Sequence, residues 1–109
     1  MSLQIQWTHI ALQSLSEVSD YTFFEFGKRQ LRKLSNRINS TTRHISFFPL
    51  LGKHEKKLSQ QIGVEYHSIV IIKEIKLYYT ISNNILFVEY IKNTKMDDTT
   101  MLDKINSVS

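Results

Sequence analysis

The hydrophobic period of the chain changes once, and this change limits the folds that it can adopt. Apolar residues recur every three to four positions from Ala11 to about Phe48, as they do in an amphipathic helix. Pro49 then ends the pattern, because proline cannot continue a helix. From Val64 the chain is rich in Ile, Val, Tyr and Phe, the residues that strands prefer. A helical part followed by a sheet-forming part predicts an α+β domain.

The helical part divides into two helices that meet at Gly27. Thr8 is a candidate N-cap of the first helix, and Gly27 is a natural place for that helix to end. We expect the second helix from about Lys28 to Phe48. Because the break is short, the two helices are predicted to form an antiparallel hairpin. Residues 50–60 show neither the helical nor the strand period of apolar residues, and we expect a basic loop there with room for one turn of helix.

Four strands are predicted, in residues 2–7, 66–72, 75–82 and 85–92. Asn83 and Asn84 suit a two-residue turn between the last two, because asparagine tolerates positive φ. The order is therefore β-α-α-β-β-β, in an antiparallel-type sheet of about four strands with the helical hairpin packed on one face. We place a single domain in residues 1–97 and a polar tail or short helix in residues 98–109.

Composition restricts the environment and the partners of this domain. The chain has 109 residues, enough for one compact domain, and it contains no cysteine. It has no signal-peptide pattern and no apolar run near the roughly 20 residues that a membrane helix needs, so we expect a cytoplasmic protein without membrane contact. Residues 28–57 contain nine Lys or Arg against Glu55 alone, a net charge of +8. Such a block predicts an anionic partner, although a solvated helix face is the plainer alternative.

The turn at Asn83 and Asn84 fixes an expected pairing, in which Tyr78 lies opposite Glu89 and side chains alternate between two faces. The face expected to pack under the helices is apolar and holds Leu77, Tyr79, Ile81, Leu86, Val88 and Tyr90. A two-residue turn at Lys73 and Glu74 would place Ile72 opposite Ile75, so that Val70 and Ile72 also point to this core. The opposite face is predicted to hold His67, Ile69, Ile71, Lys76, Tyr78, Thr80, Ser82, Ile85, Phe87, Glu89, Ile91, Asn93 and Lys95. Its mixture of ionisable and large apolar side chains is typical of an interaction surface, and a wet sheet face is the alternative.

In its order of motifs the chain resembles the RelE/ParE superfamily of toxins from bacterial type II toxin–antitoxin systems. The resemblance covers roughly residues 3–97, and its long helical hairpin is more like ParE than RelE. It is carried by Trp7-Thr8, Phe26-Gly27, FPLLGK at 48–53, YHSI at 66–69, KLYYTI at 76–81 and NTKMD at 93–97. The chain departs from the family where many relatives have arginine or histidine, because His67, Lys76 and Asn93 stand there.

The resemblance implies a toxin of a toxin–antitoxin, or plasmid stabilisation, system. Such a toxin inhibits growth by binding a nucleic-acid-processing target, and a cognate antitoxin neutralises it, for example in a heterotetramer. Poisoning of DNA gyrase by protein contact is favoured, because the expected arginine and histidine are missing. The alternatives are a ribosome-dependent mRNA endoribonuclease that needs no metal, as in RelE, and a non-toxic basic module that binds RNA or protein. Whether the chain is an enzyme therefore stays open.

Candidate functional residues follow from the resemblance and the predicted face. The catalytic candidates are Lys76, Lys95, His67, Glu89 and Tyr78, with the lysines as phosphate clamps and His67 and Glu89 as acid or base. The binding candidates are Phe87, Ile69, Ile91, Asn93, Lys53, Lys56 and Lys57. We expect no metal and no cofactor, because the four histidines lack the spacing of metal ligands and no glycine-rich phosphate loop is present. A polar surface histidine and a plain Tyr78–Glu89 hydrogen bond are the alternatives to catalysis.

Overall fold

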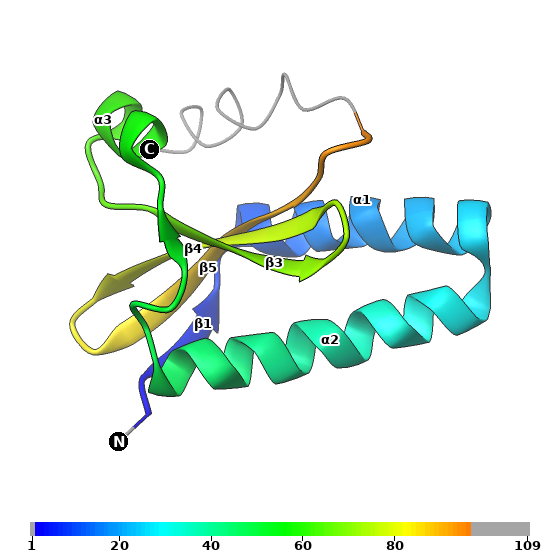
Figure 1. Ribbon diagram of the computed structural model, residues 1–109, viewed down its shortest axis with the longest axis horizontal. Helices are drawn as coiled ribbons and strands as arrows, with labels where there is room; N and C mark the ends of the chain where they lie inside the picture. The colour runs from blue at the N-terminus through cyan, green and yellow to red at the C-terminus, as the bar shows by residue number, and fades with distance from the viewer. Residues whose placement is uncertain (1, 97–109) are drawn as a thin grey trace.

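The computed structural model describes residues 2–96, so the predicted tail at 98–109 lies outside the described residues. The elements follow in the order β1 (Gln4–Trp7), α1 (His9–Phe26), α2 (Lys28–Phe47), β2 (Lys53–His54), α3 (Lys56–Ile62), β3 (His67–Ile72), β4 (Ile75–Ser82) and β5 (Ile85–Asn93) (Figure 1). None of the described helices is long and apolar enough to span a membrane.

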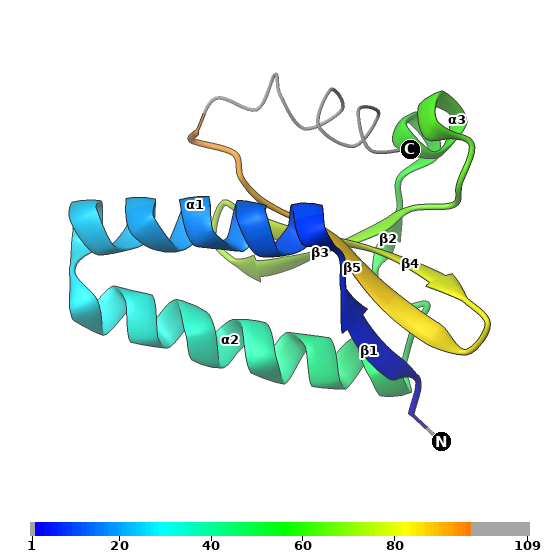
Figure 2. The same ribbon diagram turned by 180° about the vertical axis from the view of Figure 1, so that it is seen from behind.

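The predicted helical hairpin is confirmed, and α1 begins and ends at the predicted capping residues, Thr8 and Gly27. The Thr8 side-chain oxygen accepts a hydrogen bond from the backbone N–H of Ala11 at 3.0 Å, which satisfies one of the free donors at the start of α1. Gly27 has φ of 90°, a conformation that favours glycine, and it joins α1 directly to α2. Figures 1 and 2 show the two helices side by side, with their joined ends extending beyond the strands.

The sheet has five strands in the order β1-β5-β4-β3-β2, rather than about four. β1 pairs with β5 in parallel, and the other neighbours are antiparallel, so the sheet is mixed. The additional strand β2 and the seven-residue helix α3 occupy the segment that we expected to be a loop. β2 has only two residues and depends on its pairing with β3, so it has no period of its own that the sequence could reveal.

The main core lies between the helical hairpin and one face of the sheet, which we call the helix face. Buried residues of α1 and α2 meet buried residues of β3, β4 and β5 there, and the set comprises Ala11, Val18, Leu34, Ile38, Ile45, Ile71, Ile75, Leu77, Tyr79, Leu86, Val88 and Ile91. Leu77, Tyr79, Leu86 and Val88 confirm the predicted core face. Ile81 does not belong to it, because it lies near the end of β4 and is exposed. The expected apolar stripe of the second helix is confirmed at Leu34, Ile38 and Ile45, but Phe48 is exposed.

Candidate functional site

A bulge at Glu89 changes which side chains share a face of β5. The register runs from Ser82 opposite Ile85 to Tyr79 opposite Val88, as predicted, and then shifts so that Tyr78 lies opposite Tyr90. Glu89 is therefore the extra residue and has no partner in β4, which corrects the expected Tyr78–Glu89 pair. Every side chain beyond it changes face.

Two predictions for β5 are wrong for this reason. Ile91, a binding candidate, is 1% exposed and packs in the main core. Tyr90, expected in that core, lies instead on the opposite face beside Tyr78. Asn93, another binding candidate, is buried and lines a cavity beneath the helices. Lys95 is exposed and follows the end of β5, in a turn in which its backbone N–H donates to Asn93 Oδ1 at 2.9 Å.

A second bulge, at Ile71, has the same effect on β3. Ile72 lies opposite Ile75, as predicted, but Val70 lies opposite Lys76, so Ile71 is left without a partner. His67 and Ile69 consequently share the helix face with Tyr79 and Leu77, instead of lying with Lys76. Val70, which we expected in the core, is exposed. The predicted cluster of His67 with Lys76, Tyr78 and Glu89 therefore does not form.

The opposite face of the sheet is centred on three buried tyrosines. Tyr66, Tyr78 and Tyr90 form a cluster there, against which Leu58 and Ile62 of α3 and Ile10 of α1 pack. Our prediction placed large exposed apolar groups on this face, but Phe87 is half-buried and α3 covers the tyrosines. The face is thus a second small core rather than an open apolar surface.

Glu89 is held within this face in an apolar setting. Thr80 Oγ1 donates to Glu89 Oε2 at 2.7 Å, and Thr8 Oγ1 donates to its backbone oxygen at 3.5 Å. Burial raises the pKa of Glu89, and the hydrogen bond from Thr80 lowers it in part. Burial also raises the pKa of Tyr66 to about 12, with the charge of Glu89 as the smaller cause.

A carboxyl with a raised pKa is a candidate general base, but it needs partners to cleave a phosphodiester. The side-chain hydrogen bond that holds the Glu89 carboxyl comes from Thr80, a neutral hydroxyl that supplies no positive charge. Lys76 is half-buried and lies opposite Lys92, a neighbour that the sequence did not predict because the bulge creates it. Lys53, Lys56 and Lys57 are exposed on β2 and α3. The five catalytic candidates do not form one constellation, and their roles stay predictions.

A different group of ionisable side chains lies at the junction of β2 and β3. His67 stacks on Tyr79, with ring centroids 5.5 Å apart and an interplanar angle of 22°, and the ring of His54 lies 5.5 Å from that of His67. His67 Nε2 is 3.3 Å from Glu65 Oε2, and His54 Nε2 is 3.9 Å from Glu65 Oε1. We call His54, Glu65 and His67 the two-histidine cluster.

The two-histidine cluster has the parts of an acid–base pair. A carboxylate that contacts one ring nitrogen orients an imidazole and helps to fix which nitrogen carries the proton. The other nitrogen of His67, Nδ1, is buried and has no hydrogen-bond partner among residues 2–96. Sequence analysis missed His54 and Glu65, because only the pairing of β2 with β3 brings His54 opposite His67. No group of histidine and acidic side chains in the described part of the chain is arranged to hold a metal ion.

The surface of α2 is basic along its length. Lys28, Arg29, Arg32, Lys33, Arg37 and Arg43 are exposed, and the helix contains no acidic residue. Beyond its C-terminal end lies an apolar patch in which Phe47, Phe48, Leu50 and Leu51 are all exposed. A single exposed apolar residue is ordinary, but adjacent ones of this size are typical of a surface that a partner covers.

Comparison with known proteins gives a likeness of structure and none of sequence. No family model matches the sequence, and no curated protein resembles it closely enough to match. Among solved structures, the fold matches a chain of the chromosomal ParDE TA system from P. aeruginosa with a TM-score of 0.67. The match covers 86% of this chain and 98% of that chain, at 10% sequence identity. The chain therefore has the fold of a chain from a ParDE system, and the predicted RelE/ParE-like fold is confirmed.

Proposed function

We propose that this protein is the toxin component of a type II toxin–antitoxin system. The observation that carries the proposal is the fold likeness, which extends over nearly the whole of a chain from a ParDE system. The basic surface of α2 and the apolar patch beyond it support a partner that is acidic and carries apolar anchors, as expected of an antitoxin segment that orders on binding. The antitoxin would neutralise the toxin by covering these surfaces.

Within this proposal, we favour action by protein contact, of the kind that poisons DNA gyrase. A contact poison needs a surface and no catalytic constellation. The separation of Lys76, Lys95, His67, Glu89 and Tyr78 supports this mode, because phosphodiester cleavage needs a base, an acid and charge stabilisation at one phosphate.

The first experiment measures growth after induced expression of the chain from a tightly repressed promoter. We expect colony formation to fall, and to recover on co-expression of a cognate antitoxin, which is to be sought as a small acidic protein encoded by an adjacent reading frame. Unchanged growth at a confirmed protein level would refute the proposed toxin function and favour the alternative, a non-toxic basic module that binds RNA or protein. If growth stops, purified gyrase is then assayed for trapped double-strand breaks with the chain and with the Arg37→Glu, Arg43→Glu variant. Trapping by the native chain alone would support the contact mode.

The second candidate function is a metal-free endoribonuclease, and the two-histidine cluster favours it. Two imidazoles beside a carboxylate could remove the proton from a ribose 2′-hydroxyl and protonate the leaving oxygen.

The test of this candidate uses His67→Phe and His54→Ala. Phenylalanine retains a ring that can stack on Tyr79 while it removes both nitrogens, so the fold should persist. His9→Ala, an exposed change on α1, is the matched control. If the chain is a nuclease, both cluster variants restore growth and abolish new 5′ ends in cellular mRNA, and the control does neither. Toxicity that persists in both variants with intact mRNA would eliminate the nuclease.

A further inference from the structure

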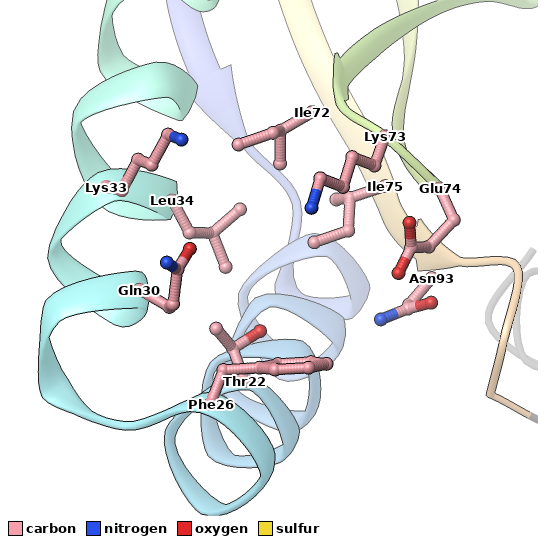
Figure 3. A pocket seen from close by; sticks show the side chains of 10 residues that line it. All are labelled: Thr22, Phe26, Gln30, Lys33, Leu34, Ile72, Lys73, Glu74, Ile75 and Asn93. Atoms are coloured by element: carbon pink, nitrogen blue, oxygen red, sulfur yellow. The ribbon is translucent and has the colours of Figure 1, made fainter.

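A cavity of about 300 Å³ lies beneath the joined ends of α1 and α2, between them and the turn that connects β3 to β4. Its inner wall is apolar and is made by Leu34 of α2 and by Ile72 and Ile75 of the sheet (Figure 3). Phe26 closes one side, and Asn93 lies at the other. The space suits one large apolar side chain, because Leu34, Ile72 and Ile75 give it nonpolar contacts at the inner wall.

The polar groups around this apolar wall favour an anion. Lys33 and Lys73 reach toward the cavity from α2 and from the β3–β4 turn (Figure 3). Asn93 is 4% exposed, and its Oδ1 already accepts the backbone N–H of Lys95. The amide nitrogen of Asn93 is therefore the end that faces the cavity, as a donor. Glu74 is the one acidic residue of the lining, against two lysines.

The backbone at Lys73 points to a role for its side chain. Lys73 has φ of 47°, in the left-handed region, which glycine and asparagine tolerate better than lysine. A residue other than glycine held there costs on the order of 1 kcal/mol. The turn between β4 and β5 meets the same requirement with asparagine at both positions. From this turn Lys73 lines the cavity, so its ammonium group is placed to pair with an anionic group of a ligand there.

Exposed aromatic residues continue the cavity outward. Phe26 forms part of the lining and is itself exposed at its outer side, and Phe23 and Phe24 are exposed on the same end of α1. An apolar ridge around a concave apolar wall is typical of a protein-binding surface rather than of a closed site for a metabolite. The adjoining turn of α2 adds Lys28, Arg29 and Arg32, which favours an acidic partner.

We propose that this cavity binds a bulky apolar side chain from an acidic peptide segment of a partner protein. Carboxylates beside the anchor residue pair with Lys33 and Lys73, and the amide nitrogen of Asn93 donates to the peptide. The exposed aromatic residues of α1 then pack against the peptide on either side of its anchor. The inference concerns the chemistry of the peptide and holds whether or not the chain is a toxin.

The experiment uses the full chain, made by cell-free synthesis, and three blocked pentapeptides followed by two-dimensional NMR. The probe has a central phenylalanine with two glutamates on each side; one control replaces the phenylalanine by alanine, and the other replaces the glutamates by lysines. We expect the probe to shift the side-chain amide of Asn93 and the methyl groups of Leu34, Ile72 and Ile75. It should bind about tenfold more tightly than either control, the ratio that corresponds to about 1.4 kcal/mol. Equal binding of the three peptides would overturn the proposal.

The variant Lys73→Asn separates a binding role from a structural one. Asparagine relieves the strained backbone, so the variant should be at least as stable as the native chain while its affinity for the probe falls several-fold. Asn84→Asp, in the exposed β4–β5 turn and outside the lining of the cavity, lowers the net charge by the same one unit and should leave the affinity within about twofold. Unchanged affinity in Lys73→Asn, or an equal loss in Asn84→Asp, would overturn the proposal. Tighter binding of free 4-phenylbutyrate than of the probe would identify a small-molecule site instead.

Discussion

Replacement of Tyr79 by phenylalanine should destabilise the protein by about 2 kcal/mol, because its hydroxyl makes two hydrogen bonds of about 1 kcal/mol each. The hydroxyl donates to the Pro49 carbonyl at 2.7 Å and accepts the Gly52 N–H at 3.0 Å. Tyr79 is fully buried, so it ties the loop between α2 and β2 to the centre of the sheet. In a domain of this size, 2 kcal/mol corresponds to a fall in Tm of roughly 10 °C.

Urea unfolding followed by the fluorescence of Trp7, the only tryptophan, measures this change. Tyr90→Phe is the matched control, because the Tyr90 hydroxyl makes no hydrogen bond within residues 2–96. We expect a change of less than about 0.5 kcal/mol there, as for substitutions away from specific contacts. Equal effects of the two substitutions would refute the claim that the Tyr79 hydroxyl anchors the loop.

Gly52 gives a second test of the same anchor. A Cβ atom at Gly52 would lie 2.5 Å from the Tyr79 hydroxyl oxygen and 2.8 Å from the Ser68 carbonyl oxygen. Gly52→Ala should therefore cost about 1–3 kcal/mol through overpacking. The double variant Gly52→Ala, Tyr79→Phe lacks the hydroxyl that makes the closest contact. Its loss of stability should therefore be smaller than the sum of the two single losses by about 0.5–2 kcal/mol. Additive losses would mean that the hydroxyl is not the group that excludes a side chain at Gly52.

Two further predictions test the bulges and the buried carboxyl. Ile91→Ala should destabilise the chain by about 2–5 kcal/mol in urea unfolding, as a core truncation does, whereas Val70→Ala should change stability by less than about 0.5 kcal/mol; similar losses would refute the observed register. Burial raises the pKa of Glu89 in the folded protein above 4.5, so the neutral carboxyl favours the folded state. The free energy of unfolding of the native chain, compared with that of Glu89→Gln, should therefore decrease as the pH rises from 4.5 through the folded-state pKa. A difference between the two proteins that stays constant over this pH range would contradict the burial of Glu89. In Glu89→Gln the pKa of Tyr66, followed by absorbance at alkaline pH, should drop below about 12 yet stay above 10, because burial is the larger cause; an unchanged midpoint would exclude the contribution of the Glu89 charge.

Local signals predicted the helices and the last turn because each depends on a few neighbouring residues. Thr8 and Gly27 mark the ends of α1 through a side-chain acceptor and a backbone with positive φ. Asn83 and Asn84 form the β4–β5 turn with φ of 51° and 63°, and the pairing nearest to that turn follows directly.

The faces beyond the bulges were not predictable, because alternation assigns them only while the period stays at two. Tyr90 and Ile91 are adjacent and both largely apolar, so each register places an apolar side chain in the core. The hydrophobic pattern therefore does not distinguish the two registers. The same holds from Ile69 to Ile72, where four apolar residues follow one another. Each bulge therefore inverts a face without a change in the hydrophobic pattern. The candidate site, which rested on those faces, was wrong in its grouping for this physical reason.

The bulges also change where a partner can bind. They turn Tyr90 toward Tyr78 and Tyr66, and α3 packs on the three rings, so the face that we expected to be an interaction surface buries its own apolar groups. Apolar area that is already buried gives little further gain on association. Two groups of neighbouring exposed large apolar residues lie instead at the two ends of α2, around Phe24 and around Phe48, with basic residues between them, whereas Val70 and Ile81 are single exposed residues of the sheet. A partner that gains free energy from both apolar burial and charge pairing therefore finds both along this helix rather than on the sheet.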